Sequence, residues 1–284
     1  MTELKLRYKS LTVNSLDRKL EKLSQDLEIE ILDLTGNKLK DIPDLRRYRQ
    51  FHKLKTLNVS GNRLATLNAA YIPQSTEVIV LDRTYIIDVP DLSSLLNLKV
   101  ISLQRNRIEQ LSPKCIPSSV TDLNLSGQWD LANPQILPDI SHLINLNKLD
   151  LSHNKVKLLN GSHLPVAIAE LKLQYNSMKV FANINHLINL KTLDLSNNKI
   201  THINGSHLPV SITDLNLSDN SLVELPDISH VTNLSTVDIT FNKITQLTGA
   251  YLPASVTNLA LRRNLLVEVT WIYYRVGPVR QLSG

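Results

Sequence analysis

The dominant feature of the sequence is a repeat with a constant period. Two successive copies occupy residues 190–226, with aliphatic residues at the first, fourth, sixth, eleventh and fourteenth places of each copy. The ninth place is Asn198 in the first copy and Asn220 in the second, 22 residues later. Because one copy is too short to bury its own aliphatic side chains, the chain can fold only as a stack of neighbouring turns.

An asparagine at the ninth place marks most turns. Nine turns carry it, and Thr84 and Gln128 occupy the same place in two more, so eleven turns follow one another. The asparagines are Asn37, Asn62, Asn106, Asn154, Asn176, Asn198, Asn220, Asn242 and Asn264. The spacing is 22 residues except from 37 to 62 and from 128 to 154, where it is 25 and 26. Since an amide both donates and accepts, the pattern predicts a structural ladder of buried hydrogen bonds between turns.

The motif LxxLxLxxNxL, present as LKTLDLSNNKI at residues 190–200, resembles the leucine-rich repeat family. The resemblance covers about residues 27–269. It implies an α/β solenoid, or horseshoe, with a curved parallel β-sheet on the concave side and 3₁₀ or extended segments on the convex side. We expect an N-terminal cap helix region at 1–26, a leucine-rich repeat domain at 27–269, and a short C-terminal cap or truncated tail at 270–284.

Two kinds of turn alternate between the strands. One has apolar residues spaced by three, as in Ile228, Val231 and Leu234, which favours a short 3₁₀ or helical segment. The other passes through Leu-Pro or Ile-Pro, as at Pro209, and is expected to be extended there. The first is similar to repeats of intracellular phosphatase regulators and internalin-like proteins, and the second to LPxSLTxLxLxxN turns of bacterial effectors and protist proteins. Neither similarity implies a particular activity.

The N-terminal region and the first long joint have their own patterns. Helical spacing of three leucines predicts a cap helix behind Asn14 or Ser15. These leucines are Leu16, Leu20 and Leu23. The joint DIPDLRRYRQFHKL adds a basic cluster that we expect on the outer side of the turn. This cluster is Arg46, Arg47, Tyr48 and Arg49.

Composition indicates the compartment. The chain has 284 residues and one cysteine, Cys115, so an intrachain disulfide is impossible. The first residues lack the apolar run of a signal peptide, and no stretch approaches the roughly 18 apolar residues of a membrane span. We therefore expect a cytoplasmic protein. The formal net charge of +5 is mild and does not argue for nucleic acid as a partner.

The common sequence motifs of catalysis are absent from this chain. The sequence contains no GxxxxGK, HExxH or GxSxG. His142, His186 and His230 recur every 44 residues, but two strand spacings separate each pair by about 10 Å. Ligands of one metal ion must all lie much closer to it. We expect no enzymatic activity, no cofactor and no metal site.

The candidate binding residues depart from the repeat consensus on the concave face and its rim. At the eighth place, where other turns have Gly, Asn or Asp, stand Arg83, Arg105, His153, Tyr175, Phe241 and Arg263. Two aromatic residues at the tenth place, Tyr85 and Trp129, complete the set. Arginine and aromatic side chains dominate the energetics of protein interfaces. The competing interpretation is scattered surface variation.

A basic rim follows the tenth place of alternate turns. It consists of Arg63, Arg107, Lys155, Lys199 and Lys243. Our preferred hypothesis is a non-enzymatic scaffold that binds a partner protein on the concave face. One alternative is an anionic-ligand binder that holds nucleic acid or phospholipid on this rim. Another is a host-directed effector or recognition protein.

Overall fold

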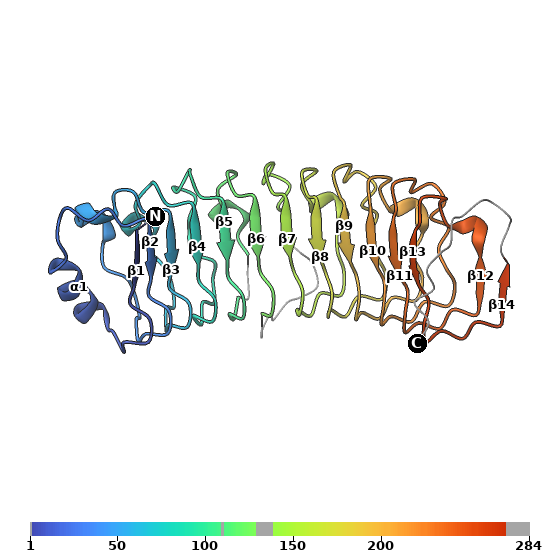
Figure 1. Ribbon diagram of the computed structural model, residues 1–284, viewed down its shortest axis with the longest axis horizontal. Coiled ribbons are helices and arrows are strands. Elements are labelled where there is room, and N and C mark those ends of the chain that lie inside the picture. Colours follow the sequence, from blue (N-terminus) through green and yellow to red (C-terminus); the bar gives the residue numbers. More distant parts are fainter. Residues whose placement is uncertain (1, 109–110, 129–138, 271–284) are drawn as a thin grey trace. The chain divides into compact units, whose positions relative to one another are not determined.

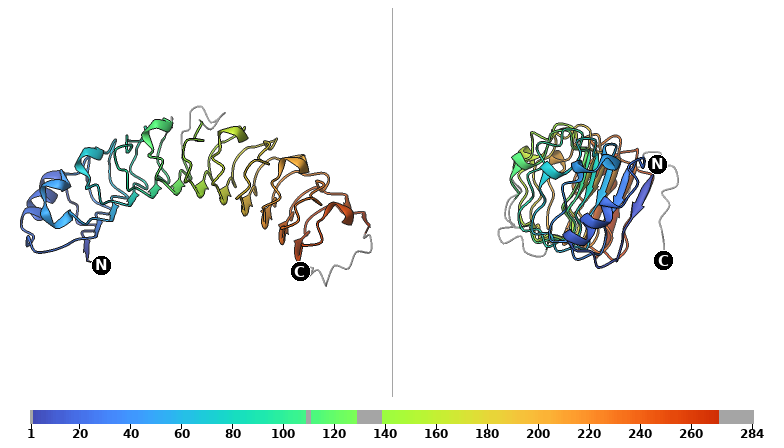
Figure 2. Two further views of the ribbon diagram at one scale, coloured as in Figure 1. Left: turned by 90° about the horizontal axis from the view of Figure 1, so that it is seen from above. Right: turned by 90° about the vertical axis from the view of Figure 1, so that its left-hand side faces the viewer.

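The repeat folds into a solenoid of short parallel strands. The computed structural model describes residues 2–108, 111–128 and 139–270. The chain forms two compact units, unit 1 mainly of residues 1–133 and unit 2 mainly of residues 147–284. In each unit the strands lie along one side and the 3₁₀ segments along the other (Figure 2).

In unit 1 the strands follow chain order, and each is parallel to the next (Figure 1). The repeat period sets the register, so that the middle leucines Leu32 and Leu57 stand side by side. The strands are β1 (Glu3–Lys5), β2 (Ile31–Asp33), β3 (Thr56–Asn58), β4 (Val78–Val80), β5 (Val100–Ser102) and β6 (Asp122–Asn124).

Unit 2 repeats this arrangement. Leu193 lies beside Leu171 on one side and Leu215 on the other. The parallel strands are β7 (Lys148–Asp150), β8 (Glu170–Lys172), β9 (Thr192–Asp194), β10 (Asp214–Asn216), β11 (Thr236–Asp238) and β13 (Asn258–Ala260). A separate parallel pair is formed by β12 (Gln246–Thr248) and β14 (Glu268–Thr270).

The core lies between successive turns, where the repeat places its aliphatic residues. In the turn of β9, the side chains of Leu190, Leu193, Leu195 and Ile200 are each 0% exposed. Ile203, at the fourteenth place, is only partly buried. Burial of one aliphatic side chain contributes roughly 1.5 to 3 kcal/mol. Each turn therefore depends on its neighbours for most of its stabilisation.

Strand β1 lies in the region where the sequence predicted only a helix. It pairs with β2 in the common register, with Leu4 beside Leu32. Its sequence, LKLRYKSL, has leucines at the fourth, sixth and eleventh places of the repeat but Lys9 at the ninth. The missing asparagine explains why the pattern alone did not reveal this strand.

The predicted cap helix is present as α1 (Val13–Glu21), and its Leu16 and Leu20 are buried. The predicted cap residues, Asn14 and Ser15, are wrong. Thr12 is the N-cap, and its side chain and that of Ser15 each accept a hydrogen bond from the other's backbone amide. Because Thr12 precedes the apolar series by four residues, the spacing alone placed the helix start too late.

The first long joint holds α1 against the first turns. Tyr48 is 9% exposed and its hydroxyl donates to the Asp17 carboxylate of α1. Gln50 Nε2 donates to the Leu23 carbonyl at 3.1 Å. The expected outward position is therefore wrong for Tyr48, whereas the three arginines of the cluster are exposed. Burial and the Asp17 carboxylate raise the pKa of the Tyr48 hydroxyl, which keeps it a donor.

The 3₁₀ segments are on the side opposite the strands, but mostly in the other kind of turn than expected. The series Ile228, Val231 and Leu234 forms two separate turns, with Val231 N donating to Ile228 O at 2.9 Å and Leu234 N to Val231 O at 3.0 Å. The 3₁₀ segments occur in the first joint and before the Leu-Pro and Ile-Pro steps. They are η1 (Leu45–Arg47), η2 (Arg49–Phe51), η3 (Ala69–Tyr71), η4 (Pro113–Cys115), η5 (Gly161–His163), η6 (Gly205–His207) and η7 (Gly249–Tyr251).

A side-chain cap explains this placement. In η6 the Asn204 side chain accepts from the Ser206 amide at 3.1 Å and so closes the turn. Leu208, which follows η6 and precedes Pro209, has φ −92° and ψ 133°. The extended conformation predicted at the residue before proline is confirmed here.

The predicted C-terminal cap at 270–284 lies, apart from its first residue, outside the described residues. Within the part of the chain that the structure describes, no helix is long and apolar enough to cross a membrane.

Candidate binding surface

The eighth place of the repeat has a left-handed backbone in every described turn. Its residues, from Tyr8 in the turn of β1 onward, have φ between 52° and 70°. The amide at this place donates to the seventh-place carbonyl of the next turn, as Arg83 does to Gln104 at 2.9 Å and Tyr175 to Ser196 at 3.1 Å. The hydrogen bonds between neighbouring turns thus continue to the eighth place. The left-handed residue there then changes the direction of the chain, so that the ninth-place side chain points into the core.

This conformation explains why glycine, asparagine and aspartate occupy the eighth place in some turns. Glycine adopts positive φ without steric cost, and Asn and Asp tolerate it. For other residues the left-handed region costs roughly 1–2 kcal/mol. The Gly, Asn and Asp at this place, visible in the sequence, were the signal for this geometry.

Large side chains at this place therefore strain the backbone, and they gain little burial in return. Tyr175 is 50% exposed and Phe241 is 53% exposed. Arg83, Arg105 and Arg263 are also exposed. Strained residues that contribute little to the core cluster at functional sites, where their exposed groups are needed. The eighth-place row is therefore the candidate binding surface.

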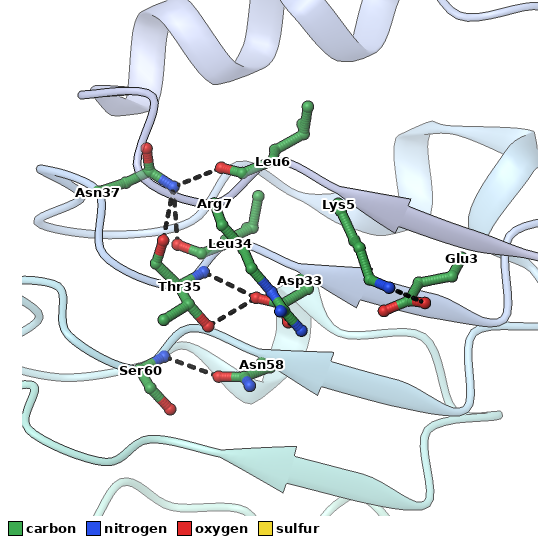
Figure 3. Close-up of polar contacts among 10 residues, drawn as sticks. All are labelled: Glu3, Lys5, Leu6, Arg7, Asp33, Leu34, Thr35, Asn37, Asn58 and Ser60. Atoms are coloured by element: carbon green, nitrogen blue, oxygen red, sulfur yellow. Dashed lines mark hydrogen bonds and ion pairs between the residues drawn. The ribbon is translucent and has the colours of Figure 1, made fainter.

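The ninth-place asparagines connect the turns beneath this row. Asn198 Nδ2 donates to the Leu195 carbonyl of its own turn and to the Leu173 carbonyl of the preceding turn, both at 3.0 Å. Its Oδ1 accepts from the Met178 amide at 3.1 Å. Figure 3 shows Asn37 joining the turns of β1 and β2 through Leu6 O and Leu34 O.

Gln128 replaces asparagine in the ladder without breaking it. Its Nε2 donates to Leu103 O at 2.8 Å and Leu125 O at 3.2 Å, and its Oε1 accepts from the Ile108 amide at 3.2 Å. The same three kinds of bond are thus made by a side chain one methylene longer. The tenth-place residue that follows, Trp129, lies outside the described residues.

Thr84 replaces asparagine in the third turn with a shorter side chain. Its hydroxyl donates to Leu81 O at 2.8 Å, and its amide donates to Asn106 Oδ1 at 2.8 Å. In neighbouring turns the ladder oxygen also accepts from the eleventh-place amide of the preceding turn. The corresponding donor for Thr84 is buried Leu64, whose amide donates to none of the described residues. Directly after Thr84, Tyr85 also has positive φ, 66°.

Thr84→Asn is expected to raise the free energy of unfolding by about 1 kcal/mol, because the new amide oxygen can accept from the Leu64 amide. Urea denaturation measures the change, and hydrogen exchange of the Leu64 amide should slow. Thr84→Ser keeps the hydroxyl and serves as the control. An unchanged midpoint together with unchanged Leu64 exchange would contradict the assignment of Leu64 as an unsatisfied donor.

In unit 1 two arginines stand between glycines. The eighth place runs Gly61, Arg83, Arg105 and Gly127 along successive turns. A Cβ at Gly127 would lie 3.2 Å from Arg105 Cγ, so the arginine stem already occupies the adjacent space. At the tenth place, the Arg107 guanidinium lies 5.4 Å from the centroid of the Tyr85 ring. This distance permits a cation–π interaction.

In unit 2 the eighth place is more varied. The His153 and Tyr175 rings stack, with centroids 4.2 Å apart and planes at 10°. Further along the row come Asn197, Asp219, Phe241 and Arg263. The two units thus present different chemistry at the same place. Unit 1 offers arginine and glycine, whereas unit 2 offers aromatic, acidic and basic groups.

The fifth-place carboxylates have a structural use. Asp194 Oδ1 accepts from the Ser196 amide at 2.9 Å, a local turn that ends the strand. Asp33 does the same for Thr35 at 3.0 Å and also accepts from Arg7 Nε at 2.6 Å (Figure 3). Burial raises the pKa of Asp33, but these hydrogen bonds outweigh it and hold the pKa below its ordinary value.

The sequence reasoning missed an apolar patch on the strands of unit 1. Val78, Val80 and Val100 are outward-facing and partly exposed, where other strands carry Thr, Asp, Asn or Lys. The signal was present, because VIV at β4 departs from the TLD and DLN found at the same places in β9 and β10. The patch lies on the same two strands that lead to Arg83 and Arg105.

The other predicted features lie as follows. The residues of the basic rim are exposed, with Arg63 and Arg107 in unit 1 and the three lysines in unit 2. His186 Nε2 lies 3.4 Å from Leu164 O and His230 Nε2 lies 3.2 Å from Leu208 O. In the described part of the chain, no group of three or more His, Cys, Asp or Glu side chains could hold a metal ion.

Comparison with known proteins agrees with the repeat and the fold. The family model described as Leucine Rich Repeat matches residues 189–209. The chain has the leucine-rich repeat fold. A search of curated proteins found no significant match.

Solved structures of leucine-rich repeat proteins are similar in fold. A chain of the Toll–Spatzle complex of Drosophila is 24% identical, with a TM-score of 0.73 over 92% of this chain and 36% of that one. InlJ of Listeria monocytogenes is 20% identical, with a TM-score of 0.67 over 92% of this chain and 53% of that one. A leucine-rich repeat protein of Leptospira interrogans is 21% identical, with a TM-score of 0.55 over 95% of this chain and 79% of that one. This chain spans about a third to a half of the length of the first two chains.

Proposed function

We propose that this chain is a non-enzymatic scaffold that binds a partner protein through the strand face and the eighth-place row. The observation that carries the proposal is the set of large, exposed side chains on left-handed backbone, such as Arg83, Arg105 and Tyr175. Nothing in the packing of the turns requires these residues, because Gly36 and Asn197 occupy the same place elsewhere.

The surroundings of this row suit a protein partner. The backbone ladder holds neighbouring turns in register, so the backbone that carries these side chains is ordered before binding and less backbone entropy is lost. The partly exposed valines of β4 and β5 add apolar area beside two arginines. Apolar groups with arginine and aromatic neighbours are typical of binding hot spots. The comparison with a Toll–Spatzle complex, a protein–protein assembly, supports the same class of function.

Arg83→Asn combined with Arg105→Asn is expected to abolish capture of the partner from cell lysate while stabilising the fold by up to about 1–2 kcal/mol. Asparagine tolerates the left-handed backbone, as native Asn197 does at the same place. Affinity capture with mass spectrometry measures the first effect, and urea denaturation measures the second.

The matched control is Arg47→Asn combined with Arg49→Asn. It changes the same number of charges in unit 1 at exposed residues of the first joint. The control should capture the partner as well as the intact protein does. Capture of the same proteins by the intact form and the Arg83/Arg105 variant would place the interface elsewhere. Loss of stability in that variant would contradict the strain argument.

A further inference from the structure

We propose that Arg83, Arg105, Arg107 and Tyr85 form an anchor for an acidic segment of the partner polypeptide, whose carboxylate or phosphate groups the guanidinium groups bind. This inference rests on the proposed scaffold function and names the chemistry that the unit 1 part of the surface recognises. The four residues follow β4 and β5, at the eighth and tenth places of two consecutive turns.

Backbone hydrogen bonds bring these residues together. Arg83 N donates to Gln104 O at 2.9 Å, and Arg107 N donates to Ile86 O at 2.9 Å. The two turns are thus hydrogen-bonded to each other both before and after the ninth place of the repeat. Strands in such a ladder are about 4.8 Å apart. Arg83 and Arg105 therefore stand on adjacent turns about one strand spacing apart, and Arg107 follows Arg105 by two residues in the same turn.

The positive charge is not neutralised within the described residues. Arg83, Arg105 and Arg107 make no ion pair with any described carboxylate. The carboxylate next in sequence, Asp82, is held by other groups, since its Oδ1 accepts from Ser102 Oγ at 2.6 Å and from Gln104 N at 2.9 Å. Like charges this close repel each other, and a bound oxyanion relieves that repulsion.

The local backbone is specialised at this point. Arg83, Tyr85 and Arg105 all have positive φ, between 53° and 66°. Among the tenth-place residues that the structure describes, Tyr85 shares this conformation only with Ser10 in the turn of β1. Tyr85 follows Thr84 and Ser10 follows Lys9, so in both turns the ninth-place asparagine is missing. The Tyr85 ring lies under the Arg107 guanidinium. Strain and a broken ladder thus coincide with the arginine cluster, as expected for a binding site.

The geometry favours a polypeptide over other anions. Guanidinium groups bind carboxylate and phosphate through paired hydrogen bonds. The side chains are exposed and lie along an edge, where a small ligand would bury too little of its surface. Beside Arg83, Gly61 carries no side chain and leaves room for an extended backbone, whereas the stem of Arg105 occupies the space beside Gly127. Specific nucleic-acid binders generally make more phosphate contacts than three guanidinium groups supply.

The test uses the full chain and labelled peptides of equal length in fluorescence anisotropy. The probes are a glutamate-rich peptide, a peptide with two phosphoserines, and a glutamine-rich peptide. We expect binding of at least one acidic peptide and none of the glutamine peptide. The two acidic arms distinguish carboxylate from phosphate as the source of the oxyanion.

Arg83→Gln combined with Arg105→Gln is expected to weaken acidic-peptide binding about tenfold or more, because hydrogen bonds to charged groups are lost. The matched control, Lys199→Gln combined with Lys243→Gln, removes the same charge from exposed residues of unit 2 and should change affinity less than about twofold. Equal weakening in both variants, or no binding of either acidic peptide, overturns the anchor. Tighter binding of a single-stranded oligonucleotide at the same salt concentration also overturns it.

The anchor and the scaffold function fail in different ways. A partner that is captured equally by the Arg83/Arg105 glutamine variant leaves the scaffold in place and overturns the anchor. Acidic peptides that bind with the expected dependence on Arg83 and Arg105, while the intact protein captures no partner from lysate, support the anchor and count against the scaffold proposal.

Discussion

Asn220→Ala is expected to lower the free energy of unfolding by about 2–3 kcal/mol. Its Oδ1 accepts from the Ile200 amide at 3.0 Å, and its Nδ2 donates to Leu195 O at 2.9 Å and Leu217 O at 3.1 Å. The two carbonyls keep bonds from the neighbouring ladder residues Asn198 and Asn242. The cost therefore falls mainly on the buried Ile200 amide, which loses its acceptor.

Urea denaturation followed by circular dichroism measures this loss, and exchange of the Ile200 amide should accelerate. Asn189→Ala is the control, because Asn189 is exposed and donates to Val166 O at 3.3 Å. A surface change of this kind usually alters stability by less than about 0.5 kcal/mol. Similar losses of unfolding free energy in the two variants would mean that a ladder asparagine stabilises the fold no more than an exposed asparagine does.

Gly205→Ala is expected to destabilise the chain by about 1–3 kcal/mol through overpacking. A Cβ at this residue would lie 1.8 Å from Asp227 O and 2.7 Å from Asp227 C, both backbone atoms of the next turn. Backbone cannot move aside as a flexible side chain can, so the turns must separate. Gly161 is packed in the same way, because a Cβ at this residue would lie 1.9 Å from Asn183 O.

Thermal and urea unfolding measure this effect, and Ser206→Ala is the control. Ser206 is exposed and its hydroxyl donates to Asn204 Oδ1 at 2.8 Å. In unit 1 the residue at the equivalent place is Ala69, which is 7% exposed. The turn of Ala69 thus accommodates a Cβ. The predicted destabilisation by alanine therefore applies to the glycines of unit 2. If Gly205→Ala is as stable as the intact protein, the close approach to Asp227 is not restrictive.

Several expectations from the sequence stay predictions. They include the partner protein, the absence of enzymatic activity and the cytoplasmic location. The role of Trp129 also stays a prediction, since this residue lies outside the described part of the chain.

The spacing of residues such as Leu193, Leu195 and Asn198 was enough to determine the fold, because stacking of equal turns requires only that the same places recur. The extended residue before Pro209 was equally predictable, since proline restricts its neighbour directly. These features depend on contacts within a turn or on the period itself.

Only the tertiary structure decided which departures from the repeat matter. The positive φ of Arg83 and Tyr175 follows from hydrogen bonds to the next turn, and the buried position of Tyr48 follows from a contact with α1. The pairing of Arg107 with Tyr85 likewise joins residues 22 apart in sequence. A pattern of residue types predicts which side chains face inward, but strain and contacts between turns arise from the position of the neighbouring backbone.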